Sequence, residues 1–315
     1  TPLWLKIQKE EIQMRNLKRA LSLALAAIML IGMMVVSASA ASYNDLTDKD
    51  QIVNKDAVSM LVSLGIIEGK PDGSYGPTEN VDRAQMAKML SVIMNKGVDN
   101  SALYQSVNSG LVDVNTNWAK GHINYCYTTG IIAGRGNGKF DPAATVTGNE
   151  AAKMLLVAAG YDAQLEGLTG NDWAIKTASL ASTLGIFDDL TAPTGDPLTR
   201  DNAALLIYNA LDIEMIQKYE NGYAIAFGDH RTLLSTKYGV YKVEGVVTGN
   251  EWAQLEDTDS EDALAAGKTK MDHVKVYKST TSNTVVGEYE TEKNPVIFNV
   301  STPVDMLGQT VTMYV

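Results

Sequence analysis

Apolar residues follow two different periods along this chain, and the change between them divides it into two parts. In the first part they recur at helical spacing. Ala119, Ile123 and Cys126 are four and three residues apart, and the stretch ends at Gly130, a residue type that favours a helix stop. A second apolar run follows at 151–157. This pattern predicts pairs of helices that are joined by loops.

From Tyr238 onward the apolar residues alternate with polar ones at a period of two. Segments 240–250, 273–277 and 295–300 are rich in β-branched and aromatic residues, and turn-forming spacers separate them. Such runs predict several short strands in a small barrel or sandwich. The last alternating run, 309–315, has no closing turn. We therefore expect this β region to be truncated by the end of the chain.

The helical part contains a repeat with an offset of 65 residues. The first copy has Leu-Gly-Ile-Ile-Glu-Gly at 64–69 and Val-Asp-Arg-Ala-Gln at 81–85. The second has Gly-Ile-Ile-Ala-Gly at 130–134 and Val-Thr-Gly-Asn-Glu at 146–150, and a shorter third copy has Leu-Thr-Arg-Asp-Asn at 198–202. One unit of this size cannot bury its own apolar face, so a fixed period predicts units that pack on one another.

Each copy also carries a capping pattern ahead of its second helix. A residue with a short polar side chain stands three positions before a residue that can hydrogen-bond back to it. Each unit is therefore predicted to be helix, glycine turn, loop and helix. The three pairs are Asp82 and Gln85, Thr147 and Glu150, and Thr199 and Asn202.

The combined order of these motifs resembles the S-layer homology family of bacterial surface proteins. The motifs are Trp-Ala, Gly-Ile-Ile-x-Gly, Asp-Gly-aromatic-x-Pro and a sequence close to Thr-Arg-Ala-Glu, and they cover about 43–211. The resemblance implies a mainly α pseudo-trimer of three helix-loop-helix repeats, followed here by the truncated small all-β domain. The segment after the repeats resembles the corresponding part of clostridial surface-layer proteins.

This resemblance and the patterns above give the expected domain boundaries. Three S-layer homology repeats occupy 41–212, a linker separates them from the β domain, and a leader and a signal peptide precede them. The ranges are 1–13 for an untranslated leader, 14–40 for the signal peptide, about 43–95, 111–160 and 168–212 for the repeats, 213–237 for the linker and 238–315 for the β-rich domain.

The N-terminal expectation comes from the residues themselves. A basic start, an apolar core at 21–36 and a small-residue cleavage site at 38–40 are typical of a secretory signal peptide. We expect Met14 to be the true start and the mature chain to begin near Ala41. The protein is then secreted, with no membrane association after cleavage, and is located in the cell wall or S-layer of a Gram-positive-type bacterium.

The family resemblance implies non-catalytic anchoring. Grooves between the repeats bind a secondary cell-wall polymer attached to peptidoglycan, often pyruvylated, and the protein forms part of a surface layer in which it self-associates. No enzyme activity and no cofactor are expected. Two alternatives stay open. The chain is the anchoring region of an extracellular enzyme, such as a glycan hydrolase, whose catalytic domain lies beyond residue 315, or it is a surface adhesin that binds through the β region.

The resemblance also implies which residues contact the polysaccharide. The arginine of the Thr-Arg-Ala-Glu motif maps onto Arg83 and Arg200. A guanidinium suits a carboxylated sugar because it offers paired donors in one plane. Gly148 stands at this position in the second copy. The groove that depends on Gly148 is therefore expected to be weak or inactive.

Two further residue types complete the predicted binding set. Trp118 and Trp173 occupy the tryptophan position of the family, where an indole can line a sugar site. Asp45 and Asp113 match the aspartate that opens a repeat. Each type has a common structural alternative, because tryptophan often belongs to the core, aspartate often caps a helix and arginine often pairs locally.

Charge and rare residues narrow the range of functions. The chain has 26 Lys and Arg against 37 Asp and Glu, a net charge of −11, which argues against nucleic-acid binding. Cys126 is the only cysteine and is expected in the core, while His122 is expected at the surface or in a groove. The acidic run 256–262 lacks the glycine and terminal glutamate of a calcium-binding EF-hand loop, so no metal site is expected.

Overall fold

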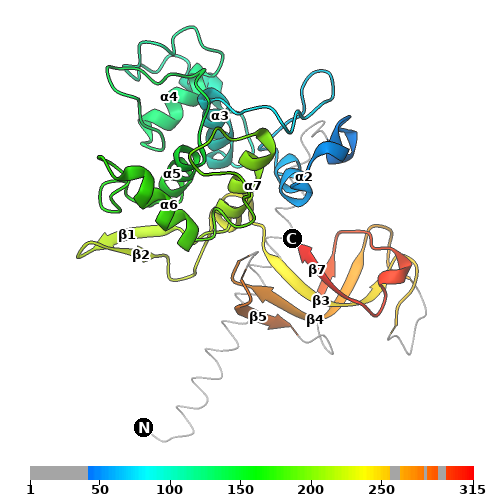
Figure 1. Ribbon diagram of the computed structural model, residues 1–315. Helices are drawn as coiled ribbons and strands as arrows, with labels where there is room; N and C mark the ends of the chain where they lie inside the picture. Colours follow the sequence, from blue (N-terminus) through cyan, green and yellow to red (C-terminus); the bar gives the residue numbers. More distant parts are fainter. Residues whose placement is uncertain (1–41, 256–262, 280–281, 290–295) are drawn as a thin grey trace, which may run out of the picture. The chain divides into compact units, whose positions relative to one another are not determined.

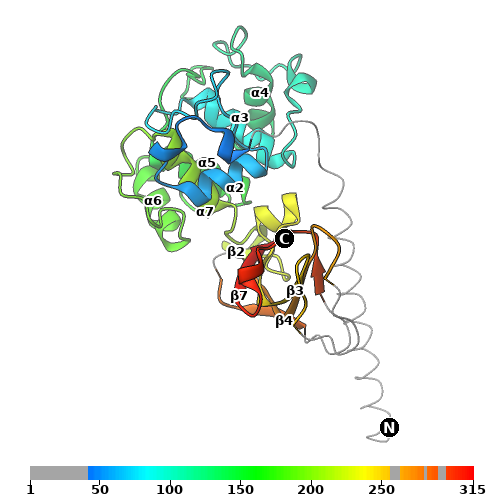
Figure 2. The ribbon, with the colours of Figure 1, turned by 90° about the vertical axis from the view of Figure 1, so that its right-hand side faces the viewer.

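The computed structural model describes residues 42–255, 263–279, 282–289 and 296–315. The predicted leader, the signal peptide and the acidic run at 256–262 lie outside these residues. The described residues belong to two compact units (Figures 1 and 2). One is mainly helical and comprises Ala40–Tyr241 with Lys278–Thr284, and the other is a β unit. A helical region followed by a small β domain is thereby confirmed.

The helices of the first unit come in three successive pairs, as the repeat predicts. Short 3₁₀ turns, η1 (Tyr43–Asp45), η2 (Lys49–Gln51) and η3 (Ser101–Tyr104), connect or precede them. The pairs are α2 (Lys55–Ser63) with α3 (Arg83–Met94), α4 (Lys120–Thr128) with α5 (Gly148–Ala158), and α6 (Trp173–Thr183) with α7 (Arg200–Ala210).

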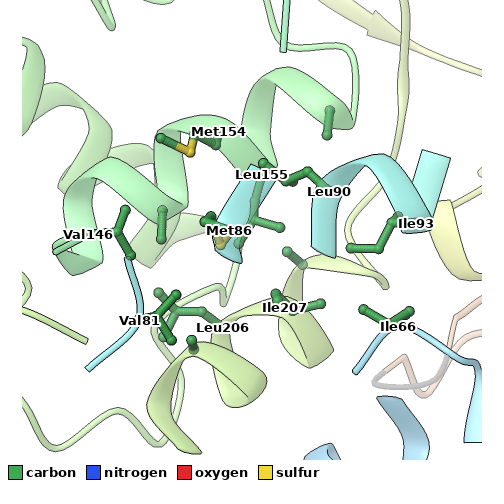
Figure 3. Close-up of a cluster of buried hydrophobic side chains, with 14 of the residues drawn as sticks. Ile66, Val81, Met86, Leu90, Ile93, Val146, Met154, Leu155, Leu206 and Ile207 are labelled. Atoms are coloured by element: carbon green, nitrogen blue, oxygen red, sulfur yellow. The ribbon is translucent and has the colours of Figure 1, made fainter. Parts of the chain in front are cut away.

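The first helix of each pair packs on the second helix of the preceding pair. Helix α4 contacts α3 and α6 contacts α5, while α2 contacts α7, so the first pair meets the last. Helices α3, α5 and α7 lie at the centre of the unit (Figure 1). Their contact buries apolar side chains from all three, each worth about 1.5–3 kcal/mol when fully buried. Figure 3 shows this cluster, with Met86, Leu90 and Ile93 from α3, Met154 and Leu155 from α5, and Leu206 and Ile207 from α7.

Three equivalent residues just before α3, α5 and α7 hydrogen-bond to one another in a cycle. The amide of Val81 donates to the carbonyl of Leu198, the amide of Leu198 to the carbonyl of Val146, and the amide of Val146 to the carbonyl of Val81. The N–O distance is 2.9 Å in each bond. Val81 and Val146 are also buried in the central cluster (Figure 3). Each segment therefore needs the other two to satisfy its backbone polar groups.

The capping predictions hold at the starts of these central helices. Asp82 with Gln85 and Thr147 with Glu150 form reciprocal capping boxes at α3 and α5. At α7, Thr199 accepts from the amide of Asn202 without the return bond. These caps satisfy amide groups that the first turn of a helix leaves without a partner.

A β-hairpin occupies the span that the sequence analysis assigns to a linker at 213–237. Strand β1 (Ile216–Glu220) pairs antiparallel with β2 (Tyr223–Ala226), and a π-helical turn, η4 (Leu234–Tyr238), follows. The hairpin turns at Asn221 and Gly222, which have φ values of 51° and 84°. Asn-Gly is the favoured pair for a tight hairpin turn with positive φ, so the sequence contained a signal for this element.

The β unit, Lys242–Tyr277 with Val285–Val315, is one antiparallel sheet with strand order β5-β4-β3-β7, and β6 also pairs with β4. Alternate residues of β3 and β4 face the interior, where Val247, Met271 and Phe298 are buried. Strands β3, β6 and β7 fall in predicted runs, β4 begins before its predicted run and ends with it, and β5 is additional. They are β3 (Lys242–Asn250), β4 (Thr269–Tyr277), β5 (Val285–Tyr289), β6 (Val296–Phe298) and β7 (Thr310–Tyr314), with the turn η5 (Val304–Met306) before β7.

Candidate ligand groove

An open groove of about 190 Å³ on the helical unit brings together residues from all three helix pairs. Most of its lining comes from the loop after α2 and from α3, and the other pairs contribute Trp118 and Arg200. Two residues predicted from widely separated motifs therefore meet in one site. The lining residues are Ile66, Ile67, Glu68, Gly69, Lys70, Tyr75, Val81, Gln85, Lys88, Met89, Trp118 and Arg200.

Arg200, the first residue of α7, is fixed by backbone carbonyls of the first repeat. Its Nε donates to the carbonyl of Tyr75 at 2.7 Å, and its terminal nitrogen Nη2 donates to the carbonyl of Glu68 at 3.3 Å. The guanidinium carbon lies 4.7 Å from the centre of the Tyr75 ring, and the Tyr75 hydroxyl donates to the Arg200 carbonyl. These contacts hold a half-buried cation at the groove with little freedom to move.

Trp118 provides a flat apolar surface at the same groove. Its side chain is 58% exposed, which is unusual for the largest apolar residue and leaves the ring accessible to a ligand. The ring of His122 supports it in an edge-to-face arrangement with 6.3 Å between centroids. Two lysines add positive charge. Lys88 pairs with Glu68 at 3.1 Å, and Lys70 pairs with Glu79.

Arg83, the first residue of α3, makes the equivalent contacts with the second repeat. Its Nε donates to the carbonyl of Phe140 at 2.9 Å, its Nη2 donates to the carbonyl of Ala133 at 3.0 Å, and the guanidinium lies over the Phe140 ring. Unlike Arg200, it is only 4% exposed, and its Nη1 lies 3.7 Å from the Glu150 carboxylate. Burial lowers the pKa of Arg83, and Glu150 acts against that shift.

Trp173 lies in the position equivalent to Trp118 and is half-buried at the start of α6. The ammonium of Lys153 is 5.4 Å from its ring centroid, a cation–π contact. Burial lowers the pKa of Lys153. The structure therefore brings Arg83 and Trp173 to the second repeat, as it brings Arg200 and Trp118 to the first.

The third equivalent position is occupied differently. A Cβ atom added to Gly148 would lie 2.9 Å from the carbonyl oxygen of Thr194, so no larger side chain fits there without a backbone shift. Val53 stands at the tryptophan position of this third site and is largely exposed. The expectation that this groove is weak stays a prediction, and its basis is now the space around Gly148 as well as the missing arginine.

Asp113 and Asp48, rather than Asp113 and Asp45, are structural equivalents. Asp113 accepts hydrogen bonds from the amides of Phe140 and Asp141 at 2.9 and 2.7 Å. Asp48 accepts from the amides of Tyr75 and Gly76 at 2.7 and 2.8 Å. Asp45 is exposed and closes a capping box with Ser42 at η1. The 65-residue offset of the repeat leads from Asp113 to Asp48, so this pair was readable from the sequence.

A family model describes these segments. The model of the S-layer homology domain matches residues 42–87 and 112–152, which are the first two predicted repeats. The chain carries S-layer homology domains. The resemblance drawn from the motifs is thereby confirmed, and so is the expected location at the cell wall or S-layer.

Among the relatives that match this chain, some carry names of surface proteins and others carry names of enzymes. The S-layer homology protein is 29% identical over 261 residues to a middle cell wall protein of Brevibacillus brevis, a match of 80% of this chain and 24% of the relative. The chain is 30% identical over 211 residues to a cell surface protein of Thermoanaerobacter kivui, a match of 66% of this chain and 26% of the relative. A third relative, exoglucanase XynX of Acetivibrio thermocellus, is 29% identical over 187 residues. This match covers 54% of this chain and 16% of the relative. The chain thus spans about a quarter or less of these relatives.

The buried polar residues of the S-layer homology domains differ partly from expectation. His122 is buried rather than exposed, because its Nδ1 lies 2.6 Å from the Ser91 hydroxyl and its Nε2 lies 3.6 Å from Asp99. Burial lowers the pKa of His122, and Asp99 acts against that shift. Cys126 is buried in the core, as expected.

Within the described ranges of this chain, no cluster of three or more His, Cys, Asp or Glu side chains is arranged to hold a metal ion. In the same residues, every helix is too short or too polar to span a lipid bilayer.

The aspartates that brace the two loops make the S-layer homology domains sensitive to acid. Burial raises the pKa of Asp48 and Asp113, but the backbone amides that donate to them outweigh it and hold each pKa below its ordinary value of 3.8. The ionised aspartates therefore stabilise the fold fully at pH values above the ordinary pKa of 3.8. This stabilisation is lost as the pH falls through the lower pKa of the folded state. We expect the melting temperature of Asp48→Asn to depend less on pH than that of the wild type between about pH 5 and about pH 2. Calorimetry at several pH values checks this, and identical slopes would contradict it.

Proposed function

We propose that the helical unit anchors the protein to the bacterial cell wall by binding an anionic secondary polysaccharide, of the pyruvylated kind, in grooves between the repeats of a pseudo-trimer. The observation that carries the proposal is the groove in which Arg200, Trp118 and Lys88 meet from three different helix pairs. In this proposal the groove holds its ligand without a reaction.

The pseudo-trimer is supported by the cyclic contacts of the three repeats. The hydrogen bonds of Val81, Val146 and Leu198 run in one direction around the centre, and Arg83 and Arg200 donate to the loop of a neighbouring repeat in the opposite direction. Arg83 of the first repeat contacts the second, and Arg200 of the third contacts the first. The third repeat, 168–212, is assigned by this pattern of contacts and by its motifs.

The groove suits a sugar that carries a carboxylate. An arginine whose Nε and one terminal nitrogen are already engaged by carbonyls keeps its remaining N–H donors for an anion in a fixed direction. The exposed indole of Trp118 can lie against the apolar face of a pyranose ring. Because the whole chain is acidic, the attraction has to come from these local cations and not from the overall field.

Sedimentation with cell walls tests the proposal. We expect the full chain to sediment with native sacculi of Brevibacillus brevis and to stay in solution with sacculi from which the secondary polymer has been chemically stripped. Trp118→Ala should weaken this binding about tenfold, since a lost aromatic contact is worth about 1.5 kcal/mol. Val53→Ala removes an exposed side chain from the site that lacks both the arginine and the tryptophan and serves as the matched control. Equal sedimentation with stripped walls would overturn the proposal.

A second candidate is that the chain is the anchoring part of a longer extracellular enzyme. The similarity to an exoglucanase over 187 residues favours it as the alternative, because that relative is much longer than the match. The β unit is then a spacer toward another domain. In the leading proposal it contributes to self-association in a surface lattice. The complete gene separates the two: a hydrolase domain after residue 315 favours the enzyme, and further β-rich domains favour the lattice.

A further inference from the structure

A buried histidine lies at the contact between the first two repeats, next to the lining of the groove. His122 belongs to α4, which packs on α3 (Figure 1), and it is only 3% exposed. Its ring contacts the indole of Trp118, which lines the groove, and its Nδ1 lies 2.6 Å from the hydroxyl oxygen of Ser91 on α3. A titratable ring is therefore one contact away from a ligand in the groove.

The other two contacts between repeats have no histidine at this place. The repeat offsets lead from Ser91 and His122 to Leu156 and Thr177 between α5 and α6, and to Tyr208 and Ala57 between α7 and α2. Packing between repeats is thus achieved elsewhere without a basic ring. A buried polar ring costs stability unless it finds partners, so the histidine beside the groove calls for an explanation other than packing.

The surroundings of His122 offer a partner to a proton on each ring nitrogen. The Ser91 hydroxyl has one hydrogen and donates it to the carbonyl of Lys88 at 2.9 Å, so its oxygen accepts from Nδ1–H of the ring. On the other side of the ring, Nε2 lies 3.6 Å from a carboxylate oxygen of Asp99, within ion-pair distance. An imidazolium has two N–H donors and matches these partners, whereas the Nε2 lone pair of a neutral ring would face the carboxylate.

The charge on the ring depends on burial and on two charged neighbours, one of which lines the groove. Burial, the largest effect, lowers the pKa of His122, while Asp99 raises it and Lys88 lowers it. Among the described residues, these two are the charged groups that face the ring from the elements packed on α4, since η3 contributes the phenol of Tyr104. Lys88 lines the groove, so an anion bound there offsets its effect on the ring.

We propose that His122 is a proton-linked positioning residue of the groove: it takes up a proton when an anionic ligand binds beside Trp118 and Lys88, so that mild acid strengthens binding. This inference rests on the proposed function and adds a regulation of the same groove. The ring is already buried, so a ligand that covers Trp118 changes its hydration little, whereas the charge of the ligand attracts the imidazolium. Coupling between two sites is reciprocal, so protonation raises the affinity by the factor by which the anion favours protonation.

The test is isothermal titration of the full chain, between about pH 7.5 and about pH 5, with a methyl N-acetylhexosaminide that carries a ketal-linked pyruvate. The ligand keeps its charge over this range, since an α-carboxyl group has a pKa of about 3.5. We expect the affinity of the wild type to rise about fivefold toward the lower pH, at the lower end of the usual coupling between two sites. The same sugar without pyruvate should show no such rise.

His122→Gln removes the titrating group and keeps a side chain that donates and accepts hydrogen bonds. Its affinity for the pyruvylated sugar should stay level between the two pH values. His273→Gln is the matched control and should behave as the wild type, because His273 is 69% exposed and belongs to the β unit. Circular dichroism verifies folding at each pH, since a histidine with a lowered folded-state pKa destabilises the fold as the pH falls below its ordinary value of 6.5.

Nuclear magnetic resonance of the imidazole protons keeps the test decisive should His122→Gln not fold. The chain has three histidines, and His230→Gln and His273→Gln identify the signals of the other two. The pKa of His122 in the wild type should rise when the pyruvylated sugar is bound. An unchanged or lower pKa would overturn the inference, and so would a rise in affinity toward acid that His122→Gln retains.

Two further results would overturn the inference while leaving the proposed function in place. These are a wild-type affinity that is level or falls toward acid, and an equal rise in affinity for the sugar without pyruvate. A different result overturns both: the wild type binds no pyruvylated sugar at either pH and also stays in solution with native sacculi.

Discussion

Replacing Arg83 by alanine is expected to lower the free energy of unfolding of the helical unit by about 3–5 kcal/mol, the cost of breaking a buried charge pair from one side. Arg83 is buried, and its guanidinium satisfies the carbonyls of Ala133 and Phe140 and faces Glu150. Without it, two carbonyls of the second repeat lose a donor and a partly buried carboxylate loses one of its two arginines. The loss is large because the contact joins two repeats.

Denaturant unfolding followed by circular dichroism measures this effect, and Arg135→Ala is the matched control. Arg135 pairs with the same carboxylate oxygen of Glu150, but its side chain is 41% exposed. Its removal should cost no more than about 1 kcal/mol, as for other surface ion pairs. Equal losses in the two variants would contradict the structural role that we assign to Arg83.

Substituting Gly121 by alanine is expected to destabilise the helical unit by about 3 kcal/mol or more. A Cβ atom at this position would lie 2.1 Å from the carbonyl oxygen of Ser101, so α4 and η3 would have to separate. The sign of the effect is informative. Alanine is favoured over glycine inside a helix by about 1 kcal/mol, so a variant without the clash would be more stable than the wild type.

Thermal melting of Gly121→Ala beside Gly195→Ala tests this explanation. Gly195 has no neighbouring atom within 4 Å of an added Cβ, so its variant should stay within about 0.5 kcal/mol of the wild type. Gly121→Ala with wild-type stability would show that the loop around Ser101 moves freely away from α4.

Much of the local structure could be predicted from the sequence because its signals are local. The capping boxes of Asp82 and Thr147 are set by residues three positions apart, and the structure forms both. The strands β3, β6 and β7 fall in the predicted alternating runs, and β4 overlaps its predicted run. The hairpin of β1 and β2 differs from the linker expected at 213–237, although Asn221-Gly222 is a turn signal.

The remaining features depend on contacts between distant residues, and no local pattern encodes them. His122 is polar and lies on a short helix, yet Ser91 and Asp99 from the first repeat allow it to be buried. The difference between Arg83 and Arg200 was likewise invisible in the motif. Arg83 is buried and lies beside the Glu150 carboxylate, whereas Arg200 is half-buried, and both environments come from residues outside the arginine motif.

The contact between the first and last helix pairs has a consequence for how the protein folds. Arg200 bonds to Tyr75 across 125 positions, and α2 packs on α7, so the first repeat cannot complete its contacts until the third has been delivered. Contacts of such long sequence separation slow folding, because loop closure precedes any gain from them. A chain that emerges from a secretion pore N-terminus first would therefore stay incompletely folded until about Leu211 has crossed. We therefore expect the helical unit to fold in one cooperative transition instead of repeat by repeat.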